Sequence, residues 1–383
     1  MSMATETPHV SNPHLLRDIQ KLGAFDVSAC FSCGTCTSVC PLSDGTTVFP
    51  RKIITYAQLG LEEKILASPE PWLCYYCGEC TDNCPRGADP AGFMMATRRW
   101  LTTKYDVTGI SKRLYGSKLA EWIGIGLLVL LAGLLAFWYH GPIVTSTVAL
   151  STFAPIQLVE LADWVVLGVL SVFLLVNVFR MYYYTVLRIP GKRIPFSAYV
   201  KNVLILPITF FTQYKFASCK KDPKKHWFSH LSRYLGYAML FVLAVFLLSE
   251  WQTDTYYPLW SPIMLLQYAA AGLLIYGLSG PLYGRLKKTE NQYKYSHSTD
   301  WMFLLLLLAT ALTGVAVVTF KYTYLPWAAY ITYAFHLMLV TALLVLEVPF
   351  AKWSHMAYRT FAPYFAKLQA LRGTPLAGGS KSG

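Results

Sequence analysis

The chain has 383 residues, 55% of them hydrophobic and 14% charged, and its formal net charge is +13 at pH 7. This composition, with a mean hydropathy of +0.39, excludes an ordinary soluble enzyme and predicts a membrane protein. The excess of Lys and Arg is expected to reflect orientation in the bilayer and contact with anionic headgroups, so no nucleic-acid partner is predicted.

Two cysteine runs of identical spacing follow a polar start and one predicted helix at 14–22. Each run has the pattern CxxCxxCxxxCP. Three thiolates on such a loop can bind three irons of a cubane cluster, while the fourth cysteine of the run binds the other cluster. The spacing therefore predicts two [4Fe–4S] clusters, the first bound by Cys30, Cys33, Cys36 and Cys84 and the second by Cys74, Cys77, Cys80 and Cys40.

Zinc and disulfides are the alternatives for these cysteines. Zinc ligands usually come as two separated pairs, whereas each run here already has four cysteines in the ferredoxin order. The N-terminal segment has no apolar signal region, so we expect these residues in a reducing cytosol, where disulfides are rare. A ninth cysteine, Cys219, is interpreted as an uninvolved thiol.

The segments around the second run indicate helices. Residues 49–66 have apolar side chains at helical spacing, interrupted at Gly60, so helices are predicted between the clusters. Residues 86–118 are expected to form a further helix and a basic segment, which starts at Arg98 and either docks a soluble partner or rests on lipid headgroups. The predicted first domain is an α-helical ferredoxin domain over residues 1–118.

After Lys118 the sequence changes to apolar stretches of about 20 residues, each long enough to cross a bilayer. Six spans are predicted, at 119–139, 163–186, 229–250, 263–284, 301–320 and 327–350. The loops 140–162 and 251–262 contain no Lys or Arg, whereas the segments 187–228 and 285–300 are basic, which predicts cytoplasmic clusters and a cytoplasmic C-terminus. A membrane domain is expected over 119–360 in the inner membrane, followed by a tail, 361–383, with a disordered end.

Histidines within or beside these spans are candidates for function, because titratable side chains are costly in a bilayer. His230 and His355 are expected at one depth on different spans, as the two axial ligands of a haem iron require. His336 lies about 28 Å from His355 along a helix, so it would mark a second site. His226 shares the helical face of His230 and is an alternative ligand. A hydrogen-bonded structural role is the alternative for each of these histidines.

The last span resembles a known family. Residues 336–356, HLMLVTALLVLEVPFAKWSHM, are similar to the final span of the haem b subunit of respiratory nitrate reductases and of the membrane subunit of heterodisulfide reductases. The two histidines are one residue further apart here than in that family. Leu240 stands where the family has a second histidine on the earlier ligand helix. The resemblance implies a six-helix haem b bundle, in which the outer haem would lack its sixth ligand.

The N-terminal part resembles the small two-cluster subunit of heterodisulfide reductase. Its fusion to a haem module resembles the C subunits of the quinone-interacting membrane-bound oxidoreductase complexes of sulfate reducers. The resemblance implies menaquinol as membrane partner, soluble FAD- and iron–sulfur-containing subunits, and adenylylsulfate (APS) reductase as electron acceptor. Quinol oxidation releases two protons, and a site needs groups that accept them. The candidates at the outer surface are four carboxylates: Glu160, Asp163, Glu250 and Asp254.

The expected function is electron transfer from quinol, through haem b and two clusters, to a soluble flavoprotein. The sequence contains no Walker loop and no GxGxxG after a predicted strand, so substrate chemistry is expected on another subunit. Two alternatives remain: an electron-input subunit of a membrane heterodisulfide or sulfite-linked reductase, and a transporter or structural anchor that merely carries clusters.

Overall fold

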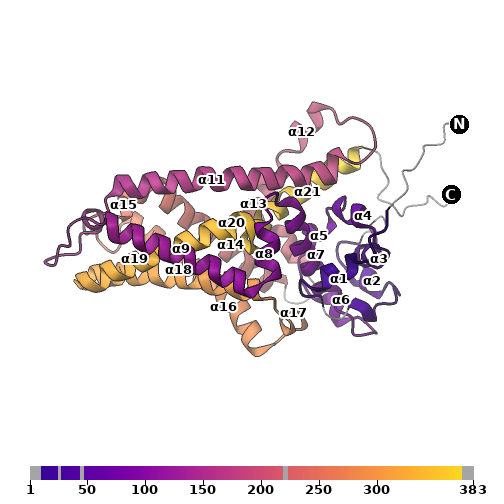
Figure 1. The fold of residues 1–383 in the computed structure, drawn as a ribbon, viewed down its shortest axis with the longest axis horizontal. Helices are drawn as coiled ribbons and strands as arrows, with labels where there is room; N and C mark the ends of the chain where they lie inside the picture. The colour runs from indigo at the N-terminus through magenta and orange to yellow at the C-terminus, as the bar shows by residue number, and fades with distance from the viewer. Residues whose placement is uncertain (1–9, 25–26, 44–46, 219–222, 373–383) are drawn as a thin grey trace.

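The computed structural model describes residues 10–24, 27–43, 47–218 and 223–372. Figure 1 shows an elongated molecule, in which long helices run side by side over one part and short helices from the N-terminal part of the chain form the other. We call the end of the long helices that meets the short ones the cluster end, and the opposite end the far end. Every regular element in the described ranges is a helix, as predicted.

The N-terminal domain consists of short helices joined by tight loops. Its elements are α1 (Leu15–Gln20), η1 (Val27–Ala29), α2 (Thr35–Val39), α3 (Arg51–Gln58), α4 (Glu62–Leu66), α5 (Glu70–Leu73), α6 (Glu79–Asp82), α7 (Pro90–Tyr105) and α8 (Ile110–Gly116). The predicted interruption at Gly60 is confirmed, since it separates α3 from α4. The longest helix, α7, begins at Pro90 because the carboxylate of Asp89 accepts a hydrogen bond from the Gly92 amide at 2.9 Å.

In the described part of the chain, six helices are long and apolar enough to cross a membrane, as the sequence predicts. They are α9 (Lys118–Tyr139), α11 (Ile156–Tyr182), α14 (Pro223–Phe246), α16 (Pro262–Lys287), α18 (Ser298–Tyr322) and α19 (Pro326–Ala342). The second continues through a π-helical turn, η2 (Tyr183–Leu187), and the sixth through another, η4 (Leu343–Glu347), into α20 (Val348–Phe350). Their outer faces expose Leu127, Val172 and Ile331, as helices surrounded by lipid do.

Two short apolar helices were not predicted. They are α12 (Phe196–Asn202) and α13 (Ile205–Thr212), which lie in the segment 187–228 that the sequence indicates only as a basic connection. Phe196, Leu204 and Phe211 are 81%, 64% and 61% exposed. Exposed apolar side chains on short helices beside membrane spans are typical of helices that lie at the headgroup boundary. The other short elements are α10 (Leu150–Phe153), η3 (Tyr214–Ser218), α15 (Leu248–Trp251), α17 (Asn291–Lys294) and η5 (Lys352–Ser354).

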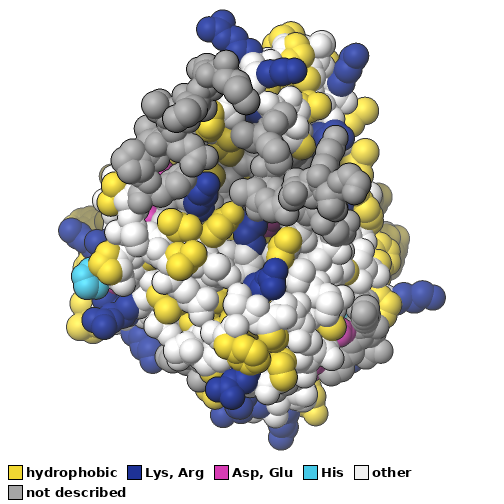
Figure 2. All heavy atoms as spheres, turned by 90° about the vertical axis from the view of Figure 1, so that its right-hand side faces the viewer, with side chains coloured by type: hydrophobic (Ala, Val, Ile, Leu, Met, Phe, Trp, Pro, Cys, Tyr) yellow, Lys and Arg dark blue, Asp and Glu magenta, His cyan; other side chains and the backbone are white. Residues whose placement is uncertain are grey.

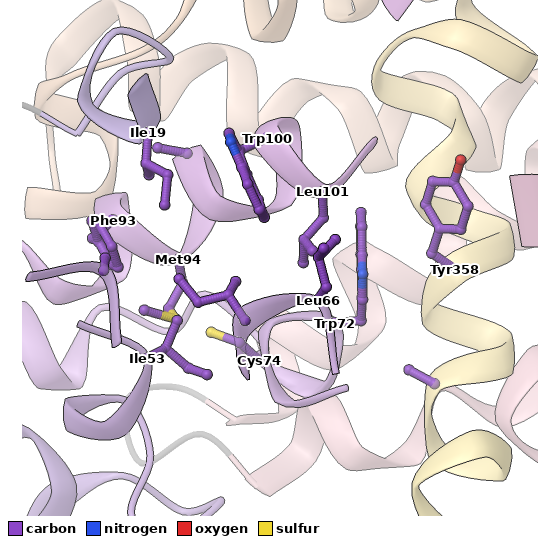
Figure 3. Packing of buried hydrophobic residues seen from close by; sticks show 14 of the residues in the cluster. Ile19, Ile53, Leu66, Trp72, Cys74, Phe93, Met94, Trp100, Leu101 and Tyr358 are labelled. Carbon is purple, nitrogen blue, oxygen red and sulfur yellow. The ribbon is translucent and has the colours of Figure 1, made fainter. Parts of the chain in front are cut away.

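The last helix, α21 (His355–Leu371), leaves the bundle and enters the core of the N-terminal domain (Figure 1). Tyr358, Phe365 and Leu368 are buried there. Figure 3 shows Tyr358 facing Trp72, and their ring centroids are 4.7 Å apart. The predicted start of a tail at residue 361 therefore falls inside a helix that packs on the cluster domain. The predicted disordered end and Cys219 lie outside the described residues.

The basic segment that starts at Arg98 is less exposed than expected. Arg98 and Arg99 are only 4% and 5% exposed. Arg99 forms an ion pair of 2.6 Å with Asp300 of α18, and Asp300 forms a second one of 2.6 Å with Lys352. Neither arginine is therefore available to headgroups or to a partner protein. Arg99 instead fastens the N-terminal domain to the cluster end of the bundle.

Candidate functional site

The two cysteine runs fold into matching loops. In each loop the residue before the second cysteine has a positive φ, 64° at Ser32 and 57° at Tyr76. The glycine after that cysteine is left-handed, with φ of 91° at Gly34 and 83° at Gly78, and it begins α2 or α6. A residue without Cβ adopts this conformation at no steric cost, so each turn favours its glycine. The same backbone reversal thus occurs once in each run.

Cys40 of the first run lines the same cavity as three cysteines of the second run. This cavity is lined by all four cysteines of the predicted second site: Cys40, Cys74, Cys77 and Cys80. Burial raises the pKa of Cys40 to about 12, and the neighbouring Cys74 and Cys77 add to the rise. A hollow bounded by four thiols fits a cluster of several atoms.

The remaining four cysteines gather around Cys36. Burial raises the pKa of the Cys36 thiol, and the charges of Cys30, Cys33 and Cys84 raise it further. The structure thus brings Cys84 of the second run to the first. Cys33 is exposed, whereas two of the second site's thiols are buried. The first site therefore lies nearer to solvent than the second.

A site for a single metal ion differs from these two sites. Within the described ranges, no three His, Cys, Asp or Glu side chains converge as ligands of one ion. A cubane cluster binds each thiolate through a different iron, so its ligands stand further apart than those of one zinc ion.

Positive charge borders the second site. Arg98 donates hydrogen bonds to the carbonyl oxygen of Pro71 at 2.6 Å and to that of Cys74. Burial raises the pKa of the Cys74 thiol, and the charges of Arg98 and Arg359 counteract that rise. An anionic cluster bound here would therefore meet two guanidinium groups in a part of the protein that excludes water.

Both loops belong to one domain of known type. Residues 26–88 match the 4Fe-4S dicluster domain. The match includes both cysteine runs, and together with the helical structure it confirms the predicted α-helical ferredoxin domain next to the six spans. No solved structure matches the chain.

Curated relatives of this iron–sulfur domain come from archaea. A protein of Archaeoglobus profundus that is itself similar to the C subunit of heterodisulfide reductase is 37% identical over 94 residues, which are 24% of this chain and 50% of that protein. The iron–sulfur C subunit of the CoB–CoM heterodisulfide reductase of Methanopyrus kandleri is 34% identical over 101 residues, 24% of this chain and 53% of its own. The chain thus spans about half the length of the curated relatives it matches.

At the cluster end, His230 of α14 and His355 of α21 are close enough for the charge of one to act on the other. His230 Nδ1 is buried and has no hydrogen-bond partner in the described part of the chain. His355 Nδ1 hydrogen-bonds to the carbonyl oxygen of Lys352. This bond places the proton on Nδ1 and leaves Nε2 free, as second-shell partners of metal-binding histidines do. Burial lowers the pKa of His355 well below its ordinary value, so the imidazole stays neutral.

Aromatic side chains connect the second cluster loop to His230. Phe216 of η3 stacks on the His230 ring with centroids 3.8 Å apart, and Tyr75 meets Phe216 edge-on at 5.1 Å. Tyr75 directly follows Cys74. The Arg359 guanidinium lies 4.5 Å from the Phe216 ring centroid and 5.4 Å from that of Tyr75. None of the three linking residues was predicted, because their contacts join segments that are distant in the sequence and carry no motif.

His336 lies in α19, in separate surroundings. Its Nδ1 is 2.9 Å from the hydroxyl of Thr313, and its ring packs so closely on α18 that a Cβ on Gly314 would lie 3.3 Å away. Between His336 and His355 the chain passes through η4 and α20 and then breaks at Ala351, whose φ is −124° and ψ −146°. The separation of about 28 Å expected for one continuous helix therefore does not apply.

The π-turn η4 also bears on the difference in histidine spacing. A π-turn closes over five residues rather than four, so it accommodates one more residue than an α-turn. If the resemblance of the last span holds, the extra residue between its two histidines would be accommodated at Leu343–Glu347. Leu240, the position at which that family has a further histidine, packs against the apolar core of the bundle. His226 is half-buried, one turn before His230 on α14.

The four predicted far-end carboxylates have different surroundings. Asp254 accepts hydrogen bonds from two backbone amides of α10 and from the Thr152 hydroxyl. Burial alone would raise the pKa of Asp254, but these hydrogen bonds outweigh burial and hold the pKa below its ordinary value. Glu250 accepts a hydrogen bond from a tyrosine hydroxyl at 3.1 Å on the exposed surface. Glu160 and Asp163 stand one turn apart on α11, where their charges interact.

Proposed function

We propose that this chain transfers electrons from a membrane quinol to soluble partner proteins through a haem b held by His230 and His355 and through two [4Fe–4S] clusters. When bound, these groups supply one-electron carriers, while the protein provides their ligands, order and charge environment. The observation that carries the proposal is the continuous contact from Tyr75 through Phe216 to His230. It joins the loop of the second cluster site to the histidine pair.

The two cluster sites differ in burial, and this difference supports a direction for electron transfer along the route. The second site adjoins the bundle and has buried thiols, whereas Cys33 of the first site is exposed. Phe31 beside it is 61% exposed, and the Arg86 guanidinium lies 5.6 Å from its ring centroid. Electrons from the membrane would therefore enter the N-terminal domain at the second site and leave at the first.

The partners proposed for this exit are soluble FAD- and iron–sulfur-containing subunits, with APS reductase as the final acceptor. Figure 2 shows the cluster end of the molecule, with Lys and Arg side chains spread over the visible face and few acidic ones. A basic face of this kind fits an acidic partner surface. The basic connections between spans support a cytoplasmic location for this end in the inner membrane.

Menaquinol is the proposed electron donor, and its proton acceptors are proposed among Glu160, Asp163 and Glu250 at the far end. Asp254 is a weaker candidate, because its oxygens already accept several hydrogen bonds. The pair Glu250→Gln and Asp163→Asn tests this placement. Quinol oxidation should be lost in the double variant, and its survival would move the quinol site to the cluster end. His336, with its Thr313 contact, remains the proposed ligand of a second, far-end haem.

A second candidate function has support from the relatives. The two relatives described above are 34–37% identical in sequence to the cluster domain, which favours an electron-input subunit of a membrane heterodisulfide or sulfite-linked reductase. The two candidates differ in the soluble proteins that bind the exposed first cluster site. Copurification of the complex from native membranes distinguishes them, because each predicts a different catalytic partner.

The deciding experiment follows electrons through the purified native complex. A menaquinol analogue should reduce a b-type α band in the visible spectrum and then the cluster signals in electron paramagnetic resonance (EPR). Phe216→Leu should retain all cofactors and slow cluster reduction by quinol, while reduction by dithionite is unchanged. Phe228→Leu, on the exposed face of α14, is the matched control. A complex that purifies without haem would contradict the proposal and favour an anchor that carries clusters.

A further inference from the structure

Two glutamates are buried inside the bundle at the cluster end, and the proposed electron route uses neither. Glu121 is in the first turn of α9, Glu347 closes η4, and each is only 2% exposed. Their charges act on each other. A Cβ on Gly124, one turn after Glu121, would lie 3.2 Å from a methyl carbon of Leu346. The close approach of α9 and η4 thus holds the two carboxyl groups together.

The carboxyl group of Glu121 is buried without a partner. Within the described part of the chain neither of its oxygens has a hydrogen bond, although the Ser298 hydroxyl lies nearby. Glu347 accepts one hydrogen bond, from the backbone amide of Lys352 at 3.0 Å. An unpaired buried carboxylate is strongly unfavourable, and two neighbouring ones also repel each other. The pair therefore holds at least one proton.

The net charge of the groups around the two glutamates fits a pair that holds one proton. The titratable and charged groups that face it or its nearest ions are Tyr76 in the second cysteine loop, Arg99 on α7, Tyr115 on α8, the exposed Lys118 at the start of α9, Arg285 on α16, His297 and Asp300 at the start of α18, and Lys352 on η5. Arg99 and Lys352 are both ion-paired with Asp300, which leaves one positive charge in excess. A single ionised glutamate balances it. Arg285 acts on Asp300 more weakly than these two partners do.

Lys352 connects the glutamates to the histidine pair. Its amide donates to the Glu347 carboxylate, and its carbonyl oxygen accepts the hydrogen bond from His355 Nδ1. One peptide segment therefore contacts both groups. An electron gained at the histidine site adds negative charge next to this network, where the low dielectric leaves it poorly screened. A second proton on the glutamates would offset that charge.

We propose that Glu121 and Glu347 form a proton-exchanging site, which holds one proton before the haem at His230 and His355 gains an electron and two protons afterwards. The inference rests on the proposed haem. The electron comes from the quinol of the proposed function. The proton comes from solvent at the cluster end and forms an O–H bond on the ionised carboxylate. When the electron leaves, this bond breaks and the proton returns to solvent.

The test is a redox titration of the b-type absorbance of the purified complex at neutral pH and one unit to either side. The haem potential should fall as pH rises, by up to about 59 mV for each tenfold change in proton concentration. Glu121→Gln and Glu347→Gln should each flatten this slope while the haem content is kept. Glu63→Gln, at an exposed carboxylate paired with Arg188, should leave the slope unchanged.

A second measurement does not depend on haem. Infrared spectra of the complex should contain the C=O stretch of a protonated carboxyl at neutral pH, and either glutamine variant should remove it. If haem is absent but the band is present, the proposed function fails and the shared proton stands. If haem is present and both variants keep the wild-type slope, or the wild type has none, the coupling is refuted. The absence of the band refutes the shared proton.

Discussion

Cys40 and Cys84 each leave their own loop and join the thiols of the other, so neither cluster site is complete without both cysteine runs. With the proposed ligand sets, bound clusters would connect residues 30–40 to residues 74–84 as disulfides connect two loops. Loss of Cys40 should therefore affect the second cluster site, and loss of Cys84 the first, because each of these cysteines is the single proposed ligand from its run at that site.

Cys40→Ala should damage the cluster bound mainly by the second run. Wild type should contain eight non-haem iron atoms per chain in the cluster domain, as two cubane clusters require, and the variant about four. Iron and acid-labile sulfide analysis on anaerobically purified protein checks the count, and EPR assigns the lost signal. Cys219→Ala, at the cysteine outside both runs, is the control and should keep full iron. Loss confined to the cluster of the first run would reverse the pairing.

Histidine substitutions should separate the two proposed haem sites. His355→Ala and His230→Ala should remove the same haem, because the two side chains are close enough at the cluster end for their charges to interact. His336→Ala should act on a different one, since its ring packs on α18. Reduced-minus-oxidised spectra and a pyridine haemochrome assay measure both outcomes, with His140→Ala at the exposed far end as the control. Full haem in His355→Ala would contradict the ligand assignment.

Sequence reasoning could identify residues whose chemistry is unusual for their position. Eight cysteines in a repeated pattern and histidines beside membrane spans are of this kind. Glu121 and Glu347 were not predicted, because a glutamate at the end of a predicted span resembles an ordinary interfacial charge until folding buries it. Phe216 has no chemical signature either, and only its stack on His230 gives it a role.

Helices were predictable where a long apolar run specifies them, and much less so elsewhere. All six spans follow from such runs, and only their ends differ from the predicted bounds. The short helices α12 and α13 escaped prediction because the basic residues around them dominate the composition of segment 187–228. The breaks within the last span depend on local backbone geometry at Ala351 and η4, which hydrophobic periodicity does not encode.

The contact between α7 and α18 should be a main determinant of how the two parts of the chain hold together. Asp300→Ala leaves Arg99 and Lys352 buried without their shared anion. Removing one partner of a buried pair costs about 3–5 kcal/mol, so the unfolding temperature should drop clearly. Thermal unfolding in detergent, followed by circular dichroism, measures the change.

The control for Asp300→Ala is Asp18→Ala, which removes a surface ion pair with Lys21. A pair of this kind contributes about 0–1 kcal/mol, so the unfolding temperature should hardly change. Limited proteolysis adds a local readout, since a loosened N-terminal domain should be cut faster near α8. Equal effects of the two variants on stability and cleavage would show that the Arg99 contact does not fasten the domain.

The molecule as a whole should have its cluster domain in the cytoplasm. Two far-end loops, 140–162 and 251–262, have no Lys or Arg, and the cluster end is basic (Figure 2). Ser146→Cys should react with a membrane-impermeant maleimide in intact spheroplasts, and Lys287→Cys only in inverted vesicles. Both positions are exposed, and the unmodified chain gives the background labelling. The opposite labelling pattern would place the clusters outside and rule out a cytoplasmic acceptor.

One helix, α21, connects the membrane-spanning bundle to the cluster domain. Helix α21 begins at His355, passes Trp72 with Tyr358 and ends in the core of the cluster domain. The first turn of this helix therefore fixes the position of the proposed haem ligand His355 relative to Trp72 in the cluster domain. One residue inserted between His355 and Tyr358 would turn the rest of the helix by about 100°. Such an insertion should uncouple the proposed haem from the proposed clusters, although it removes none of their proposed ligands.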